Sequence, residues 1–226
     1  MDEVDISIRK ANKHIKQMLA QDKSSLSFWS RYFPTRNDAS DFMKNCLKKL
    51  LTRRMMLRTE WYVEIADKMP KIHDSRPALQ VIFLVALAES IARRRFTKRQ
   101  AYQLKSKGLI INFFKYITDP DKKELETKFR RSLTSTGYHQ LRISSIVRIL
   151  YQVRNDAVHG EEYWSFSLVD IRRHKDAHEP HWRLMTSGWL GTTKRKRRIT
   201  IETKLTYENL RDIFVRTAIQ NIQSKF

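Results

Sequence analysis

Apolar residues recur at intervals of three and four positions along most of the chain, as they do on the buried face of an amphipathic α-helix. The pattern is weak over residues 1–23. It is strong in the next segment, where Asp38 or Ser40 is the expected N-cap and the helix is expected to end, with or without a break, before Pro70. The first third of the chain is therefore predicted to be helical.

The segment 76–95 is apolar almost all round, which is typical of a helix at the centre of a domain. Pro77 suits its first turn. Glu89 is the one acid of this segment, and a buried carboxylate needs a positively charged partner, for which Arg154 is a candidate. A solvated position at the helix edge is the alternative for Glu89. Further helices are predicted from Gln100 or Lys105 to Ile117, from about Pro120 to Leu133, and over about 138–158.

The character of the sequence changes after Gly160. Residues 161–205 hold tryptophans, glycine turn signals and the alternating run Ile199-Thr200-Ile201-Glu202-Thr203, which together predict two to four short strands. Thr206 is then the expected N-cap of a last helix.

The predicted fold class is mostly α. We expect a helical bundle with a small antiparallel β insertion at about 161–205, between the helix over about 138–158 and the C-terminal helix. Residues 1–75 are predicted to be a helical extension that packs on the domain formed by residues 76–226.

The chain carries a large positive charge. Its 226 residues include 45 lysines and arginines against 24 aspartates and glutamates, a formal net charge of +21. Such an excess favours a polyanionic partner, most simply nucleic acid, with an acidic membrane surface as the alternative. The most apolar run, Val81–Ala88, is shorter than the roughly 20 residues of a bilayer-spanning helix. We therefore expect nucleic acid as a partner and no membrane.

The single cysteine, Cys46, allows no disulfide within the chain, which fits a reducing compartment. The charged N-terminal segment lacks the apolar run of a secretory signal, so a cytoplasmic location is expected. The sequence has no glycine-rich phosphate loop, GxSxG elbow or HExxH helix, which argues against nucleotide hydrolases, serine hydrolases and zinc proteases. His174, His178 and His181 have a metal-like spacing, but their segment contains a proline and is more simply a solvated loop.

The segment with candidate chemistry is Arg154-Asn155-Asp156-Ala157-Val158-His159, followed at once by Gly160. An arginine stabilises charge on a phosphate and a histidine transfers protons near neutral pH, so this pair can cleave a phosphodiester without a metal. Arg154 and His159 are five residues apart, about 140° around a straight helix, and so do not meet over one phosphate. Either the chain leaves the helix at His159, or a second copy supplies the partner across a symmetric cleft.

The run RNDAVHG resembles the signature of HEPN-domain proteins, which are compact helical domains with an Arg-x4-6-His motif. Many of them are metal-independent RNases of toxin–antitoxin, abortive-infection and CRISPR systems. Val85–Phe96 is also similar to the buried helix that precedes the motif in many such domains, and the resemblance covers about 76–226. It implies a homodimeric endoribonuclease without metal or cofactor, acting in antiphage defence or as a toxin, with an antitoxin or activating partner.

The resemblance also implies roles for the motif residues. His159 would act as general acid or base toward the ribose 2′-hydroxyl, Arg154 would hold the scissile phosphate, and Asn155 would orient one of them or bind phosphate. The products would carry 2′,3′-cyclic phosphate and 5′-hydroxyl ends, and DNA would not be cut because it lacks the nucleophile. Glu89 and Asp156 are candidate supporting residues.

Two basic clusters are candidate RNA-binding residues. One follows the central helix and the other lies in the predicted β insertion: Arg93, Arg94 and Arg95, and Lys194, Arg195, Lys196, Arg197 and Arg198. A favourable helix-end charge and a solvated surface, respectively, are the alternatives. The alternative function is a non-catalytic RNA- or DNA-binding subunit of a larger complex, in which the charge matters more than the motif.

Overall fold

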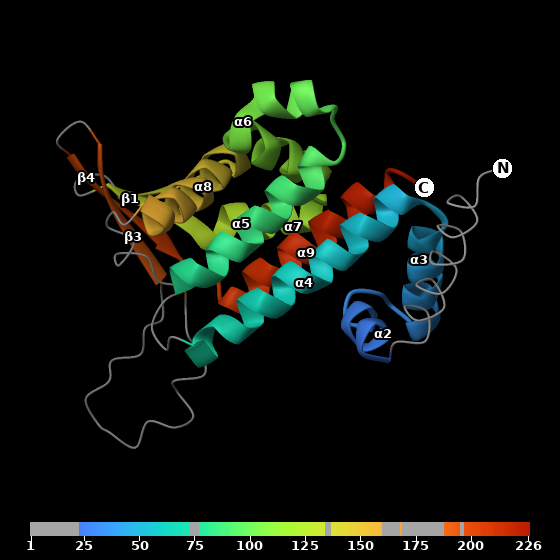
Figure 1. Cartoon of the computed structure of the whole chain (residues 1–226). Coiled ribbons are helices and arrows are strands. Elements are labelled where there is room, and N and C mark those ends of the chain that lie inside the picture. Colours follow the sequence, from blue (N-terminus) through green and yellow to red (C-terminus); the bar gives the residue numbers. More distant parts are fainter. Residues whose placement is uncertain (1–22, 73–76, 134–136, 160–167, 169–187, 195–196) are drawn as a thin grey trace, which may run out of the picture.

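The helix α5 (Pro77–Arg93) is the element around which the others pack (Figure 1). The computed structural model describes residues 23–72, 77–133, 137–159, 168, 188–194 and 197–226, and these residues are mostly helical. The helices in contact with α5 are α4 (Leu50–Ile72), α6 (Lys98–Phe113), α8 (Ile143–His159) and α9 (Tyr207–Gln223). The predicted mostly helical class and the central position of the 76–95 segment are confirmed.

The apolar residues of α5 face in almost every direction because helices cover it on several sides. Its fully buried residues are Val81, Leu84, Val85, Leu87, Ala88, Ile91 and Ala92. The helices α2 (Lys23–Ser30) and α3 (Arg36–Lys48) contribute Trp29, Phe42 and Met43 to the same hydrophobic cluster. The described residues before α5 therefore share one core with those after it.

Threonine N-caps begin α3, α6, α9 and α7 (Asp119–Lys128). The predicted cap at Thr206 is confirmed. The predicted cap of α3 at Asp38 or Ser40 is wrong, because Thr35 holds that place. Asp38 is the third residue of the helix, and its carboxylate accepts a hydrogen bond from the Thr35 backbone N–H (3.1 Å), which completes a capping box.

The helix α4 continues through Pro70 to Ile72, beyond its predicted end. A proline within a helix lacks the N–H that would bond the carbonyl four residues earlier, here that of Ala66. The side-chain amide of Gln80 on α5 donates a hydrogen bond to the Ala66 carbonyl instead (3.2 Å). A contact between α4 and α5 thus replaces the missing helical bond, and no local pattern reveals it.

The helix α6 begins at Lys98, before both of the predicted starts, Gln100 and Lys105. A kink at Lys105, where φ is 52° and ψ is 174°, interrupts its regular backbone. A short 3₁₀ helix, η1 (Phe114–Tyr116), follows α6 and ends just before the predicted boundary at Ile117.

Two strands, β1 (Phe129–Leu133) and β2 (Gly137–Gln140), lie where helices are predicted. α7 ends at Lys128 and α8 begins only at Ile143, so the predicted boundaries at about 133 and 138 are wrong. β1 pairs antiparallel with β2 and, on its other side, with β4 (Arg197–Thr203). Pairing with β4, which is distant in sequence, makes residues 129–133 a strand. The local spacing of apolar residues does not indicate this pairing.

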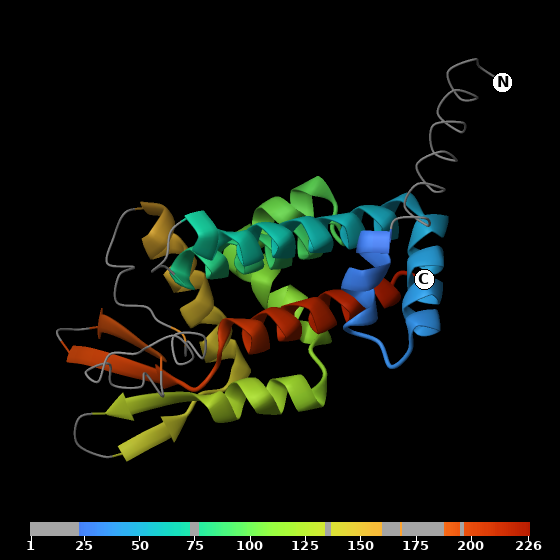
Figure 2. The ribbon, with the colours of Figure 1, turned by 90° about the horizontal axis from the view of Figure 1, so that it is seen from below.

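β3 (Gly188–Lys194) completes an antiparallel sheet of order β2-β1-β4-β3. Figures 1 and 2 show this sheet at one end of the helical bundle. β3 and β4 lie between α8 and α9, within the segment predicted as a β insertion, but residues 160–167 and 169–187 of that segment fall outside the described part.

The weak helical pattern over residues 1–23 falls almost wholly outside the described residues and stays a prediction. Within the residues that the structure describes, no helix combines the length and the apolar character needed to cross a membrane.

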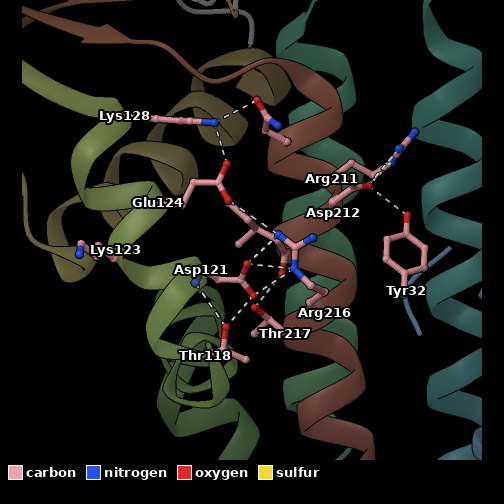
Figure 3. A network of polar contacts seen from close by, with 12 residues as sticks. Tyr32, Thr118, Asp121, Lys123, Glu124, Lys128, Arg211, Asp212, Arg216 and Thr217 are labelled. Carbon is pink, nitrogen blue, oxygen red and sulfur yellow. Dashed lines mark hydrogen bonds and ion pairs between the residues drawn. The ribbon is translucent and has the colours of Figure 1, made fainter. Parts of the chain in front are cut away.

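A polar network joins α7 to α9 (Figure 3). Arg216 on α9 binds Asp121 through two nitrogens, with Nη2 at 2.6 Å and Nε at 2.9 Å from the same carboxylate oxygen. Asp121 is nearly fully buried in the first turn of α7 and also accepts a hydrogen bond from the Thr118 hydroxyl (2.9 Å). Although burial disfavours the charge of Arg216, the hydrogen bond to Asp121 raises the pKa of its guanidinium.

Replacing Asp121 by alanine should lower the free energy of unfolding by about 2 kcal/mol, between the values typical of exposed and of buried ion pairs. The change removes both contacts with Arg216 and the negative charge at the α7 N-terminus. Urea denaturation measures the loss. The control is Asp41→Ala, which removes one partner of an exposed pair with Lys44 and should cost less than about 0.5 kcal/mol. Equal losses in the two variants would contradict the role of Asp121.

Cys46 is completely buried within the core, and burial raises the pKa of its thiol. Because the thiolate is the reactive form, the folded protein should not react with dithionitrobenzoate at pH 8. The same reagent should titrate the thiol fully once urea unfolds the chain. Rapid reaction of the folded protein would contradict the core position of Cys46.

Candidate active site

α8 carries the Arg-x4-His motif at its C-terminal end. Its buried residues form one face, because Leu150 follows the adjacent pair Ile146 and Val147 by four and three positions and Val153 follows Leu150 by three. This face packs against α5, α6 and α7. Since Val153 directly precedes the motif, the packing that holds α8 in place also fixes where the motif begins.

Arg154 extends toward α5, where its Nη2 lies 3.9 Å from Oε1 of Glu89. Its Nη1 donates a hydrogen bond to Oδ1 of Asn155 (3.0 Å). The side chain of Arg154 is 25% exposed and that of Glu89 is 13% exposed. The predicted pairing of Glu89 with Arg154 is confirmed, and the guanidinium is positioned from two helices while remaining open to solvent.

The contact between Glu89 and Arg154 is electrostatic rather than a hydrogen bond. Its 3.9 Å separation is too long for a hydrogen bond, and the buried Oε1 of Glu89 has no hydrogen-bond partner among the described residues. Opposite charges attract more strongly there than on an open surface, because less water screens them. The attraction therefore orients the guanidinium without occupying its donors.

The guanidinium of Arg154 keeps donors for a ligand. Arginine has five N–H donors, and within the described part of the chain this one donates only the bond to Asn155. A planar, partly exposed guanidinium with remaining donors suits the oxygens of a phosphate. The arrangement can therefore hold an anion and stabilise negative charge on it.

His159 is the last residue of α8. The backbone is helical from Arg154 to His159, so the Cα atoms of these residues are about 140° apart around the helix axis. The side chains of His159 and Asp156 lie outside the described part. Their convergence with Arg154 on one phosphate, within a chain or between two copies, stays a prediction.

The three arginines at the end of α5 have different environments. Arg93 is exposed, whereas the Nε of Arg94 is buried without a hydrogen-bond partner among the described residues. Arg95 donates hydrogen bonds to Oδ1 of Asn221 (3.0 Å) and to the hydroxyl of Tyr116, and its guanidinium covers the Tyr116 ring at 3.8 Å from the centroid. Arg95 thus joins neighbouring elements of the fold, and RNA binding by Arg93 and Arg94 stays a prediction.

The basic run in the predicted insertion belongs to the β3–β4 hairpin. Lys194 ends β3, and Arg197 and Arg198 begin β4, with Lys194 opposite Arg197 in the register. Arg195 and Lys196 lie outside the described part, as do the side chains of the other three. RNA binding by this run stays a prediction.

Across the described ranges, no three histidine, cysteine, aspartate or glutamate side chains are grouped so that they could hold a metal ion. His174, His178 and His181 fall outside those ranges.

Arg58 makes a contact next to Glu89 that the sequence pattern does not predict. Nη1 of Arg58 on α4 donates a hydrogen bond to the hydroxyl of Ser90 on α5 (3.2 Å), and Ser90 directly follows Glu89. Helical spacing alone places Arg58 on an exposed face of α4. Only the packing of α4 along α5 brings it to Ser90.

Comparisons with protein-family models, curated proteins and solved structures find no match to this chain. The candidate site therefore rests on its own residues: a motif at the end of α8, a guanidinium held by Glu89 and Asn155, and a strongly basic composition.

A double-mutant cycle measures the coupling of Glu89 with Arg154. Arg154→Ala leaves a mostly buried carboxylate without its partner and should cost about 2 kcal/mol, whereas Glu89→Gln removes the charge together with the ion pair and should cost less than about 1 kcal/mol. The double variant should cost less than the sum of the single ones by at least about 1 kcal/mol. Urea denaturation of the four proteins gives these values, and additive losses would contradict the ion pair.

Proposed function

We propose that the chain is a metal-independent endoribonuclease of the HEPN type. The observation that carries the proposal is the partly exposed guanidinium of Arg154, held by Glu89 and Asn155 at the end of an amphipathic helix. The run RNDAVHG supports the type of domain, and the net charge of +21 supports RNA as the substrate, because basic surfaces attract the phosphate backbone.

In the proposed reaction His159 takes the proton of a ribose 2′-hydroxyl. The 2′-oxygen attacks the adjacent phosphorus, the bond from phosphorus to the 5′-oxygen breaks, and the partner's His159, in its protonated form, gives a proton to the leaving 5′-oxygen. Arg154 binds the non-bridging oxygens, whose negative charge grows in the transition state. Asn155 accepts the hydrogen bond that orients this arginine. The products are a 2′,3′-cyclic phosphate and a 5′-hydroxyl.

A homodimer is the assembly that we propose. Because Arg154 and His159 are about 140° apart around α8, a second copy related by two-fold symmetry would bring the arginine of one chain and the histidine of the other to one cleft. The β insertion at about 161–205 would then hold RNA through its basic hairpin. A dimeric RNase of this kind would act in the cytoplasm as a toxin or an antiphage effector, controlled by an antitoxin or an activating partner.

The alternative is a non-catalytic subunit that binds RNA or DNA. The high net charge is compatible with it, because charge alone gives salt-dependent binding without cleavage. Such a protein would not depend on the Arg154 guanidinium or on His159 for its activity. The two functions therefore differ in the effect of substitutions at these two positions.

Purified protein with end-labelled RNA in EDTA should yield fragments that end in a cyclic phosphate. Arg154→Ala and His159→Ala should each lower the cleavage rate by at least about 100-fold, since each removes a group that acts in the transition state. The matched control is Arg148→Ala, which removes an exposed arginine from the same helix and should retain the rate within about threefold.

Two results would contradict the proposed function. One is cleavage that stops in EDTA and returns with a divalent metal. The other is cleavage by Arg154→Ala or His159→Ala at the wild-type rate.

A further inference from the structure

The exposed face of α4 presents two arginines and a tryptophan in line. Arg54, Arg58 and Trp61 are spaced by four and three residues, so they lie on one face, and all three are exposed. Trp61 is 53% exposed, whereas tryptophan is largely buried on average. The buried side of α4 carries the core residues Met55 and Met56.

Arg94, four residues after the Ser90 that Arg58 contacts, lies near this surface. Burial, and then the positive charges of Arg58 and Arg54, lower the pKa of the Arg94 guanidinium. The guanidinium groups of Arg54, Arg58 and Arg94 therefore lie near one another. Among the described residues, nothing accepts a hydrogen bond from the buried Nε of Arg94.

The fold holds this cluster together without neutralising it. The hydrogen bond from Arg58 to the Ser90 hydroxyl (3.2 Å) fixes the arginine of α4 against α5. Among the described residues, none of Arg54, Arg58 and Arg94 forms an ion pair with a carboxylate. Repulsion between fixed like charges is relieved when an anion binds between them.

The aromatic residue beside the cluster identifies the kind of anion. Trp61 meets Tyr62 edge to face, with 4.9 Å between ring centroids, so its ring is supported from one side while much of it remains exposed. Cations that bind phosphates beside an exposed aromatic ring on which a base can stack are the combination found in single-strand binding grooves. Arg54 and Arg58 are one helical turn apart, about 6 Å along the axis, a spacing suited to neighbouring phosphates of an extended strand.

We propose that Arg54, Arg58, Arg94 and Trp61 form a binding surface for single-stranded RNA outside the cleavage site, which we name the α4 surface. The inference rests on the proposed function, since it takes RNA as the substrate. α5 joins the two regions, because Glu89 contacts Arg154 on α8 while its neighbour Ser90 contacts Arg58 on α4. A strand on the α4 surface supplies affinity to a substrate that is cut at Arg154, so its loss raises KM and leaves kcat unchanged.

The test measures binding separately from cleavage. All proteins carry His159→Ala, so that a fluorescein-labelled 20-nucleotide single-stranded RNA stays intact, and fluorescence anisotropy gives Kd at several salt concentrations. Arg54→Ala/Arg58→Ala should raise Kd by about tenfold or more and lower the slope of log Kd against log salt by about 1.4, or 0.7 for each lost phosphate contact. The matched control removes two exposed lysines with the same spacing on α3, Lys44→Ala/Lys48→Ala, and should keep both values.

Trp61 distinguishes stacking from simple charge attraction. Trp61→Ala should raise Kd by about fivefold or more at an unchanged salt slope, because a stacking contact releases no counterions. Trp61→Phe should restore most of the affinity. Circular dichroism and thermal denaturation establish that each variant is folded as the parent is.

Three results would overturn the proposal. The first is that the Arg54/Arg58 variant binds RNA as tightly as the Lys44/Lys48 control. The second is that Trp61→Ala keeps full affinity. The third is that the α4 variants bind RNA normally but lose binding to phosphatidylglycerol vesicles, which would assign the surface to a membrane.

Failure of this proposal is distinguishable from failure of the proposed function. If the wild-type chain cuts RNA while the α4 variants keep both Kd and KM, the α4 surface is wrong and the endoribonuclease stands. If RNA is never cut but its binding depends on Arg54, Arg58 and Trp61, the surface stands and belongs to a non-catalytic RNA-binding protein.

Discussion

The burial of α5 is the constraint on which the candidate site depends. Neighbouring helices cover this helix, so a carboxylate within it needs a cation from another element. Among the described residues that cation is Arg154, which approaches Glu89 from α8 to 3.9 Å. The ion pair connects the motif on α8 to the central helix α5 and orients the Arg154 guanidinium toward Glu89. Hydrophobic packing thus positions a charged group whose remaining donors are available to a ligand.

The apolar run of α5 predicted a central helix, and its single acid predicted the long-range pairing of Glu89 with Arg154, because a buried charge requires a partner. Other contacts between distant segments were not predicted. β1 becomes a strand because it pairs with β4, and α4 passes Pro70 because Gln80 bonds the carbonyl that the proline leaves without a donor. The spacing of neighbouring residues predicts neither of these two contacts.

A high positive charge does not by itself identify the arginines that meet a ligand. Arg95 and Arg216 are engaged by Tyr116 and Asp121, and their charges hold elements of the fold together. Arg94 instead keeps a buried donor without a partner among the described residues. The hydrogen-bond partners and the burial of an arginine distinguish a packing role from a ligand-binding role. The sequence alone does not make this distinction. This distinction is the physical basis for assigning a ligand to one basic group and a packing role to another.

We propose that this chain cleaves RNA through the ribose 2′-hydroxyl at Arg154. The most direct measurement maps the cleaved linkage in an RNA and then replaces the ribose on its 5′ side by deoxyribose in an otherwise identical strand. This one linkage should become resistant while the strand still binds with unchanged Kd, because only the nucleophile is missing. Cleavage of the deoxy-substituted linkage at the original rate would contradict it.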